Sequence, residues 1–327
     1  MPPSTTYLPE FAKCLPMIAA IDIDIGADLA IHAEDYLSPK ELAHFHQFKH
    51  SRRRHEWFTA RLVCKLLFSR YLSNTHLANS NFVWPPTIQK FGCNDIATVL
   101  PLVYRSIEVL PSNPSLKGAS QLFWQGNILC TVYLSITHAG GWAIASLSCS
   151  GPVGLDVEEP IFRRPDFYES YFSKQEILWV QEQIKDDLSI SQLYTLLWTL
   201  KESYLKTGRS PINNICDFCN LEVKIYPSLF TISKHLPERE FNSQLHILKL
   251  QFSYAKSTFA PHAAFSIMPN LVLSMVAFDF DPQLGDVLKV FGEDNSLLHK
   301  QIHLHKLTQN EGSLTHGDRF YRYSPNF

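Results

Sequence analysis

The chain lacks an excess of charge of either sign. Its 327 residues include 29 Lys and Arg against 31 Asp and Glu, for a formal net charge of −2. A protein that attracts nucleic acid through its overall field needs a basic excess, so the sequence predicts no nucleic-acid partner. Any site for an anion must therefore be a local cluster of cations.

Long apolar runs and the features of an export signal are also missing. The first 25 residues carry no basic stretch, and Pro16, Asp22 and Asp24 interrupt their apolar residues. A secretory signal needs a basic region followed by an unbroken apolar one, and a membrane helix needs about 20 apolar residues in a row. We therefore expect a cytoplasmic protein without a membrane span.

Cysteine is too scattered for a disulfide framework. The chain has seven cysteines, and only Cys216 and Cys219 form a C-x-x-C pair. A zinc ribbon needs four ligands, so reduced thiols are the simpler interpretation and a zinc or redox module remains an alternative. His299 and His303, in the polar C-terminal region, are a second, weaker zinc candidate.

Hydrophobic periodicity predicts a chain of mixed class, in which strands and helices both occur in each part of the sequence. The predicted strands are 17–25, two within 132–149 around Gly140-Gly141, one in 152–158, and others in 244–256 and 271–280. The predicted helices start after the caps Ser38 and Ser173, cover 51–73, and end at Gly208. Residues 75–130 are expected to be loops with short strands.

Three sequence features recur in the same order in both halves of the chain. IDID (21–24) matches LDVE (155–158), and Tyr36-Leu-Ser-Pro-Lys-Glu41 matches Tyr171-Phe-Ser-Lys-Gln-Glu176. Trp57-x-x-x-Arg61-x-x-x-Lys65 then matches Trp198-x-x-x-Glu202-x-x-x-Lys206. The recurrence predicts two copies of one unit with Glu202 in the place of Arg61, although short amphipathic helices also resemble one another by chance.

Two carboxylates are expected to lie side by side on a strand. Asp156 and Glu158 in GLDVE are two residues apart, so their side chains share a face, with Leu155 and Val157 buried behind. Adjacent carboxylates repel each other unless a divalent cation, a Lys or Arg partner, or a shared proton lies between them. Taken alone, a D-x-E pair is more often an acidic turn.

A third carboxylate and a lysine are expected on one stripe of a helix. Trp198, Glu202 and Lys206 follow one another at intervals of four residues, which places them on the same face. Three carboxylates with open coordination positions suit Mg²⁺, and a lysine suits a phosphate oxygen. A surface Glu–Lys pair is the simpler interpretation of this motif when it is considered alone.

Cations and one histidine complete the set of candidate ligands for an anion. The run from Lys49 to His55 contains Arg52, Arg53 and Arg54, and is the densest basic cluster in the chain. It is either a solvated helix face or a cradle for a polyanion. His138 ends a predicted strand before a glycine turn, where a histidine is usually structural but can also donate to an anion.

Together these residues resemble the 4′-phosphopantetheinyl transferases, specifically the larger monomeric type that activates surfactin synthetase. The motifs are Thr137-His138, Gly154-Leu-Asp-Val-Glu158, Phe172-Ser-Lys-Gln-Glu176 and Trp198-Thr-Leu-Lys-Glu-Ser-Tyr-Leu-Lys206, in that order. The resemblance covers roughly residues 17–280. The sequence departs from the family's usual glycine–lysine–proline turn, for which Lys117-Gly118 is the nearest match.

The resemblance implies a pseudo-twofold α/β (α+β) fold of two similar halves, each a small, mostly antiparallel sheet packed with helices, with coenzyme A between them. It implies transfer of phosphopantetheine from coenzyme A to a serine of an apo acyl or peptidyl carrier protein, with release of adenosine 3′,5′-bisphosphate. Mg²⁺ would be held by Asp156, Glu158 and Glu202, and Glu202, directly or through a metal-bound water, would take the serine proton. The implied catalytic residues are Glu202, Lys206, Asp156 and His138, and the implied coenzyme A ligands are Arg53, Arg54, Arg61, Lys117, Thr137, His138, Lys201 and Lys206.

The expected organisation follows from the same resemblance. Residues 1–150 would be the coenzyme A-binding half, 151–280 the Mg²⁺-binding catalytic half, and 281–327 an extension without a counterpart. A non-catalytic relative that binds coenzyme A or a carrier protein on the same scaffold is the alternative, and the intact set of carboxylates argues against it.

Overall fold

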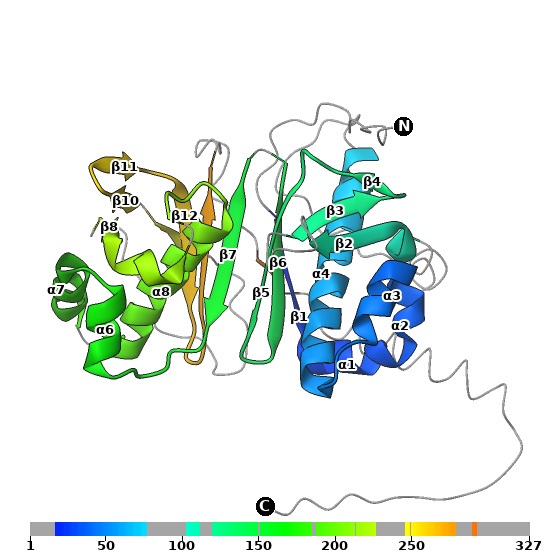
Figure 1. Cartoon of the computed structure of the whole chain (residues 1–327), viewed down its shortest axis with the longest axis horizontal. Coiled ribbons are helices and arrows are strands. Elements are labelled where there is room, and N and C mark those ends of the chain that lie inside the picture. The colour runs from blue at the N-terminus through cyan, green and yellow to red at the C-terminus, as the bar shows by residue number, and fades with distance from the viewer. Residues whose placement is uncertain are drawn as a thin grey trace, which may run out of the picture. The chain divides into compact units, whose positions relative to one another are not determined.

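Two four-stranded sheets, one for each half of the chain, form the centre of the fold (Figure 1). The computed structural model describes residues 17–76, 103–111, 120–149, 151–184, 188–212, 214–226, 246–248, 250–278 and 290–292. The first sheet has the order β14-β1-β6-β5. Its strands are β1 (Met17–Asp22), β5 (Tyr133–Ala139), β6 (Trp142–Ser148) and β14 (Val290–Gly292). All neighbours in it are antiparallel except β1 and β14, which run parallel.

The second sheet is antiparallel throughout and has the order β7-β13-β12-β9. Its strands are β7 (Val153–Glu158), β9 (His246–Leu248), β12 (His262–Ile267) and β13 (Val272–Ala277). Each half also carries a three-stranded sheet. These consist of β2 (Ile107–Pro111), β3 (Ser120–Trp124) and β4 (Asn127–Ile128), and of β8 (Leu221–Ile225), β10 (Leu250–Tyr254) and β11 (Ser257–Phe259).

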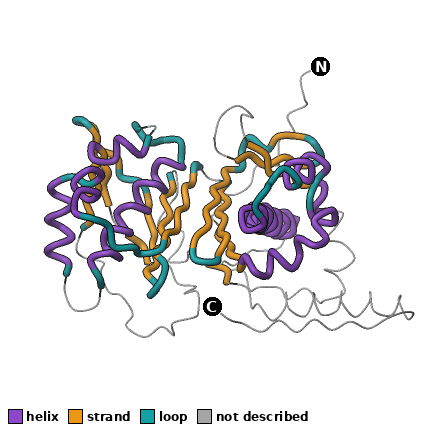
Figure 2. The backbone as a smooth tube through the Cα atoms, turned by 60° about the horizontal axis from the view of Figure 1, so that its bottom comes forward, coloured by secondary structure: helices purple, strands orange, loops and turns teal. Residues whose placement is uncertain are grey.

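One long helix packs on the main sheet of each half, and Figure 2 shows the helices on the outer sides of the strands. In the first half α4 (Ser51–His76) covers β1 and β6, and in the second α8 (Ile190–Lys206) covers β7 and β13. The remaining helices are α1 (Ile23–Leu29), η1 (Ala30–His32), α2 (Ala33–Tyr36), α3 (Pro39–Phe45), α6 (Pro165–Tyr171), α7 (Lys174–Gln183) and η2 (Ile215–Asn220). This arrangement confirms the predicted fold class.

The local sequence signals account for most element ends. Ser38 and Ser173 form complete capping boxes with Glu41 and Glu176, as predicted. Gly140 and Gly141 adopt φ of 55° and 83° in the turn between β5 and β6, where a side chain would be strained. The strand predicted over 17–25 stops at Asp22, because the carboxylate of Asp22 caps α1 by accepting from the amide of Asp24 at 2.8 Å.

The two halves repeat the same architecture, which confirms the predicted duplication. The strand order β1-β6-β5 corresponds to β7-β13-β12, and β2-β3-β4 corresponds to β8-β10-β11. Both copies have a capped short helix followed by a long helix between the first strand and the small sheet. The repeat therefore extends well beyond the three sequence features that indicated it.

A buried ion pair occurs at the same place in each copy. Lys65 Nζ donates to Glu41 at 2.5 Å and to the carbonyls of Tyr36 and Tyr104. Lys201 Nζ donates in the same way to Glu176 at 2.8 Å and to the carbonyls of Tyr171 and Phe218. The other carboxylate oxygen of each glutamate accepts a main-chain N–H from the small sheet, from Val109 or Val223. All four charged side chains are fully buried.

This twin pair corrects the register that the sequence predicted for the repeat. Lys65 corresponds to Lys201 and not to Lys206, so the position of Glu202 is held in the first copy by Leu66 and not by Arg61. The strand register moves as well. Asp22 pairs with the first residue of β6, and Glu158 pairs with the first residue of β13. The matched Trp–x–x–x–charge spacing was therefore a coincidence of two amphipathic helices.

Candidate functional site

The absence of a side chain at Gly154 lets α8 lie directly on β7. A Cβ atom at this position would lie 1.8 Å from the main-chain oxygen of Ser203, which is closer than any real contact. The alternate residues Asp156 and Glu158 share the face of Gly154, so they meet the C-terminal turns of α8. Leu155 and Val157 face the opposite way into an apolar cluster, as the sequence predicted.

Asp156 is the most enclosed carboxylate of the site, with 2% of its surface exposed. Its Oδ1 accepts from Lys206 Nζ at 2.6 Å and from the Thr137 hydroxyl at 3.1 Å. Its Oδ2 is buried without a hydrogen-bond partner among the described residues. Burial raises the pKa of Asp156, and Lys206 and Thr137 oppose that rise. A buried oxygen without a partner is energetically costly unless a ligand completes its coordination.

Glu202 adds a second carboxylate from α8, four residues before Lys206. Its Oε2 lies 3.9 Å from Lys206 Nζ, and its side chain is 18% exposed. Burial and the nearby charge of Asp156 raise the pKa of Glu202 to about 7, Glu158 adds to the rise, and a hydrogen bond from Trp198 opposes it. The stripe predicted for Trp198, Glu202 and Lys206 is therefore confirmed.

Glu158, the last residue of β7, completes the group of acids. Burial raises the pKa of Glu158, and the negative charge of Asp156 adds to the rise. Lys206 and Arg163 act in the opposite direction. Burial and the charge of Asp156 together thus outweigh the effect of Lys206 and Arg163 on Glu158.

The raised pKa of Glu202 makes the stability of the metal-free chain depend on pH. A carboxyl whose pKa is raised from 4.5 to about 7 on folding stabilises the fold while it is protonated. That contribution is complete below pH 4.5 and is lost as the pH rises toward 7. We expect Glu202→Gln to be more stable than the unmodified chain at pH 8, by up to about 3 kcal/mol, and equally stable at pH 4.5.

Thermal unfolding in EDTA at the two pH values measures this difference. Glu169→Gln, which neutralises an exposed acid on α6, is the matched control and should leave the midpoint unchanged at both. A Glu202→Gln variant that is less stable than the unmodified chain at pH 8 would show that the Glu202 charge is favourable in the metal-free fold.

The donor set fits a divalent cation of the Mg²⁺ class. Two observations support this: Oδ2 of Asp156 is buried without a partner among the described residues, and burial together with the charge of Asp156 raises the pKa of Glu202. A cation bound by oxygen ligands would relieve both. Among the described residues, however, no three acidic, histidine or cysteine side chains are gathered closely enough to hold a metal as they stand. Lys206 contacts Asp156 and lies near Glu202.

His138 joins the site from the first half of the chain. Its Nε2 lies 3.4 Å from Arg53 Nη1 and 3.5 Å from Glu56 Oε2, both on α4. Burial lowers the pKa of His138, Glu56 opposes the shift, and Arg53 and Lys206 add to it. The structure thus brings Arg53 and His138 together near Lys206, as expected for an anion site.

Sequence reasoning missed Glu56. Its carboxylate is 13% exposed and also contacts Arg52 at 3.0 Å and Arg53 at 3.7 Å. It is therefore the counter-charge of the basic cluster. The signal that could have found it is its spacing of three and four residues from two arginines on the same helix.

The donors of two other predicted coenzyme A ligands, Lys201 and Thr137, are already used within the protein. Lys201 is fully buried, and its three N–H donors are used by Glu176 and two carbonyls. The hydroxyl of Thr137 donates to Asp156 and accepts from the amide of Val157. Neither side chain has a donor left for coenzyme A, because the core of the second half takes up those of Lys201 and Asp156 takes up that of Thr137.

The remaining predicted coenzyme A ligands lie along α4 or among residues that the structure does not describe. The Arg54 guanidinium lies 5.5 Å from the centre of the Phe45 ring, and that of Arg61 lies 4.4 Å from the Trp57 ring. Burial lowers the pKa of Arg61, whose Nε is buried without a partner among the described residues. Lys117, like the zinc candidates His299 and His303, lies outside the described residues.

Two further predictions concerned the C-x-x-C pair and membrane-spanning helices. Cys216 and Cys219 lie in η2 as free thiols, the first exposed and the second partly buried. Across the part of the chain that the structure describes, no helix has the length and apolarity that a bilayer crossing requires.

Comparison with known proteins agrees with the site. Residues 152–256 match the model of the family described as 4′-phosphopantetheinyl transferase superfamily. A curated protein of Aneurinibacillus migulanus, the 4′-phosphopantetheinyl transferase gsp, is 31% identical over 87 residues. That alignment covers 25% of this chain and 35% of the relative, so the chain matches about a third of the relative's length.

The matched region begins just before β7 and includes α8, so it contains Asp156, Glu158, Glu202 and Lys206. Residues 152–256 are therefore similar to the 4′-phosphopantetheinyl transferase superfamily, in agreement with the resemblance of the motifs.

Proposed function

We propose that the chain transfers 4′-phosphopantetheine from coenzyme A to a serine of an apo acyl or peptidyl carrier protein, with Mg²⁺ as cofactor. The observation that carries the proposal is the approach of Lys206 to both Asp156 and Glu202, at 2.6 and 3.9 Å, with Glu158 on the same strand as Asp156, within the region that matches the family. Mg²⁺ bound at these carboxylates would neutralise the developing charge on the diphosphate of coenzyme A.

The reaction exchanges the phosphoanhydride bond of coenzyme A for a phosphate ester bond to serine. The serine oxygen forms a bond to the β-phosphorus of coenzyme A, and the bond from that phosphorus to the bridging oxygen of the diphosphate breaks. Adenosine 3′,5′-bisphosphate leaves with the electron pair of that bond. The serine proton would go to Glu202, the proposed base.

Cationic and neutral donors hold the diphosphate while this happens. Lys206 would exchange its bond to Asp156 for a bond to a phosphate oxygen, as a point charge does readily. Arg53 and His138 would turn from Glu56 to the phosphates, because a dianionic phosphate competes well with one carboxylate. Positioning of the two substrates supplies much of the remaining acceleration.

The direct test incubates the purified chain with coenzyme A, Mg²⁺ and several unrelated apo carrier proteins. We expect the mass of at least one carrier to increase by one phosphopantetheine group, and adenosine 3′,5′-bisphosphate to appear in equal amount. EDTA should stop the reaction and excess Mg²⁺ should restore it. Failure with every carrier, while coenzyme A still binds without Mg²⁺, would identify the chain as a non-catalytic relative instead.

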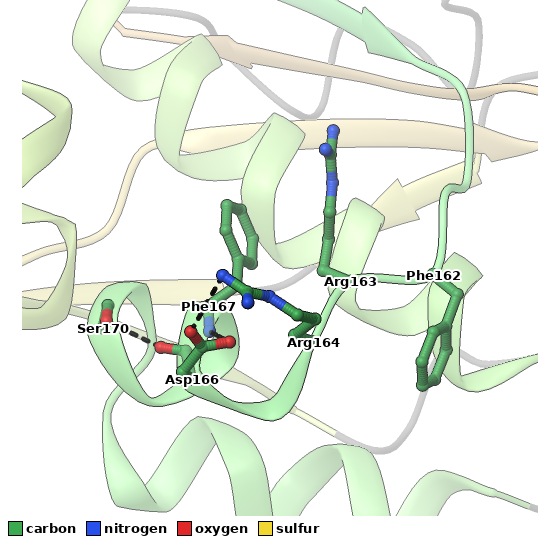
Figure 3. Close-up of a pocket in the computed structure, with 6 residues that line it drawn as sticks. All are labelled: Phe162, Arg163, Arg164, Asp166, Phe167 and Ser170. Atoms are coloured by element: carbon green, nitrogen blue, oxygen red, sulfur yellow. Dashed lines mark hydrogen bonds and ion pairs between the residues drawn. The ribbon is translucent and has the colours of Figure 1, made fainter.

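A patch beside the carboxylates is the proposed docking surface for the carrier protein. Residues 161–167 follow β7 and include Ile161 and Phe162, which are 49% and 71% exposed. Figure 3 shows Phe162, Arg163, Arg164 and Phe167 around a surface hollow of about 400 Å³. Arg163 lies 5.4 Å from the centre of the Phe167 ring and also lowers the pKa of Glu158, so the patch borders the site.

An apolar, acidic helix of a carrier protein complements this patch in both polarity and charge. We expect Phe162→Ala with Arg164→Glu to raise KM for the carrier about 10- to 100-fold, because an exposed aromatic anchor and a steering charge are lost together. KM for coenzyme A should not change. The control is Ile31→Ala with Arg105→Glu, which alters an exposed apolar residue and an exposed arginine of the first half. Equal carrier KM values in the two double variants would exclude the patch as the docking surface.

A further inference from the structure

The two halves of the chain meet along β5 and β7 (Figure 1). Side-chain hydroxyls of Ser135 and Thr137 on β5 join this strand to β7, and this contact between the two strands is called the seam. Ser135 Oγ accepts from the amide of Leu155 at 2.9 Å, and Thr137 Oγ1 accepts from the amide of Val157 at 3.2 Å. Both hydroxyl residues are nearly inaccessible, with 5% and 6% of their surface exposed. Two hydroxyls thus satisfy main-chain donors that a neighbouring strand would satisfy within a sheet.

The two hydroxyls differ in what they donate to. That of Ser135 donates back to the carbonyl of Leu155 at 3.5 Å, within the same seam. That of Thr137 donates to Oδ1 of Asp156 at 3.1 Å. Because Lys206 donates to the same oxygen, both contacts hold Oδ1 and leave Oδ2 without a partner. A partial rotation of the carboxylate about its Cβ–Cγ bond would weaken both bonds.

We infer that Thr137 is a positioning residue, which fixes the orientation in which the carboxylate of Asp156 is presented to the cation and couples that orientation to the seam between the two halves. The inference rests on the proposed function, and it replaces the expectation that Thr137 binds coenzyme A. Removal of a side chain that holds a metal ligand in its orientation typically weakens metal affinity about 10- to 100-fold.

The placement of Thr137 also links the anion site to the metal site. Thr137 contacts Asp156 and β7, and the next residue of the same strand, His138, contacts Arg53 and Glu56 on α4. Successive residues of a strand point to opposite sides, so β5 reaches both sites at once. Any displacement of this strand therefore alters the orientation of Asp156 together with the position of His138.

The test compares Thr137→Val, which keeps the shape and removes the hydroxyl, with Thr137→Ser and Ser135→Ala. Mn²⁺ serves as a probe of the metal site, and its affinity is measured by electron paramagnetic resonance with coenzyme A but without a carrier, so no turnover occurs. Amide hydrogen exchange at Leu155 and Val157 reports the seam, and thermal midpoints report folding.

We expect Thr137→Val to weaken Mn²⁺ binding about 10- to 100-fold and to speed exchange at Val157, with recovery in Thr137→Ser. Ser135→Ala, the matched control at the same seam, should speed exchange at Leu155 and keep the Mn²⁺ affinity within about twofold, because Ser135 does not contact Asp156.

Two results would overturn the inference and leave the proposed function intact. One is a Thr137→Val variant that binds Mn²⁺ as tightly as the unmodified chain, which would make Thr137 a seam residue only. The other is a loss of coenzyme A affinity in Thr137→Val without metal, which would restore Thr137 as a ligand. If the unmodified chain binds no Mn²⁺ in the presence of coenzyme A, the proposed metal site and the inference both fail.

Discussion

Replacing either Asp156 or Glu202 by alanine is expected to reduce the transfer of phosphopantetheine by at least about 10³-fold. Each substitution removes an oxygen donor from the proposed cation site, and Glu202→Ala removes the proposed base as well. Asp156→Ala also leaves the ammonium group of Lys206 without its closest partner at 2.6 Å. Initial rates with saturating coenzyme A and carrier measure the effect. Rates at about 1 mM and about 50 mM Mg²⁺ show whether a higher concentration of the cation refills a weakened site.

Glu159→Ala provides the matched control, because Glu159 is the exposed acid directly after Glu158. Its rate should stay within about threefold of the unmodified chain, since it removes the same charge without removing a proposed ligand. Thermal midpoints of all three variants separate lost chemistry from lost folding. Rates near the unmodified level in either Asp156→Ala or Glu202→Ala would refute the assignment of the metal ligands.

Lys201→Met is expected to destabilise the fold by about 3–5 kcal/mol, the largest effect on stability predicted for this chain. The substitution leaves Glu176 fully buried without its cation, and it leaves the carbonyls of Tyr171 and Phe218 without a donor. Lys65→Met should have a similar effect in the first half, where Glu41 and two carbonyls depend on Lys65. Denaturant unfolding measures the free energy of unfolding of both variants. An unchanged dependence of that free energy on denaturant concentration shows that the variants can be compared directly.

Two controls make this prediction specific to buried pairs. Asp166→Ala breaks the exposed pair with Arg164, in which the side chains are 86% and 66% exposed, and should change stability by less than about 1 kcal/mol. Lys201→Met combined with Glu176→Gln should recover part of the loss, because no buried charge then remains unpaired. A Lys201→Met variant as stable as Asp166→Ala would show that solvent reaches the pair.

Features that depend on local spacing could be predicted from the residues. Asp156 and Glu158 had to share a face of a strand, and Trp198, Glu202 and Lys206 had to share a stripe of a helix. The capping boxes at Ser38 and Ser173 placed the starts of α3 and α7. Each of these depends on the periodicity of one element and on hydrogen bonds within a few residues.

The different roles of the two lysines of α8 could not be predicted from local spacing. Lys201 and Lys206 are five residues apart, so they point roughly 140° away from each other around the helix. The amino-acid order shows that they occupy different faces. Which lysine enters the core depends on how α8 rotates against its sheet, and the close approach at Gly154 sets that rotation. Lys201 therefore pairs with Glu176 and Lys206 reaches Asp156.

The amino-acid order alone predicted the class of fold, the duplication, the resemblance to the family and the three acids of the candidate site, because short-range periodicity and motif spacing encode them. Packing between distant segments established the register of the repeat, the burial of the twin Glu–Lys pairs, and the contacts of Thr137 and Glu56. Those contacts join strand edges and helix faces far apart in the chain, and their geometry depends on how whole elements pack against one another.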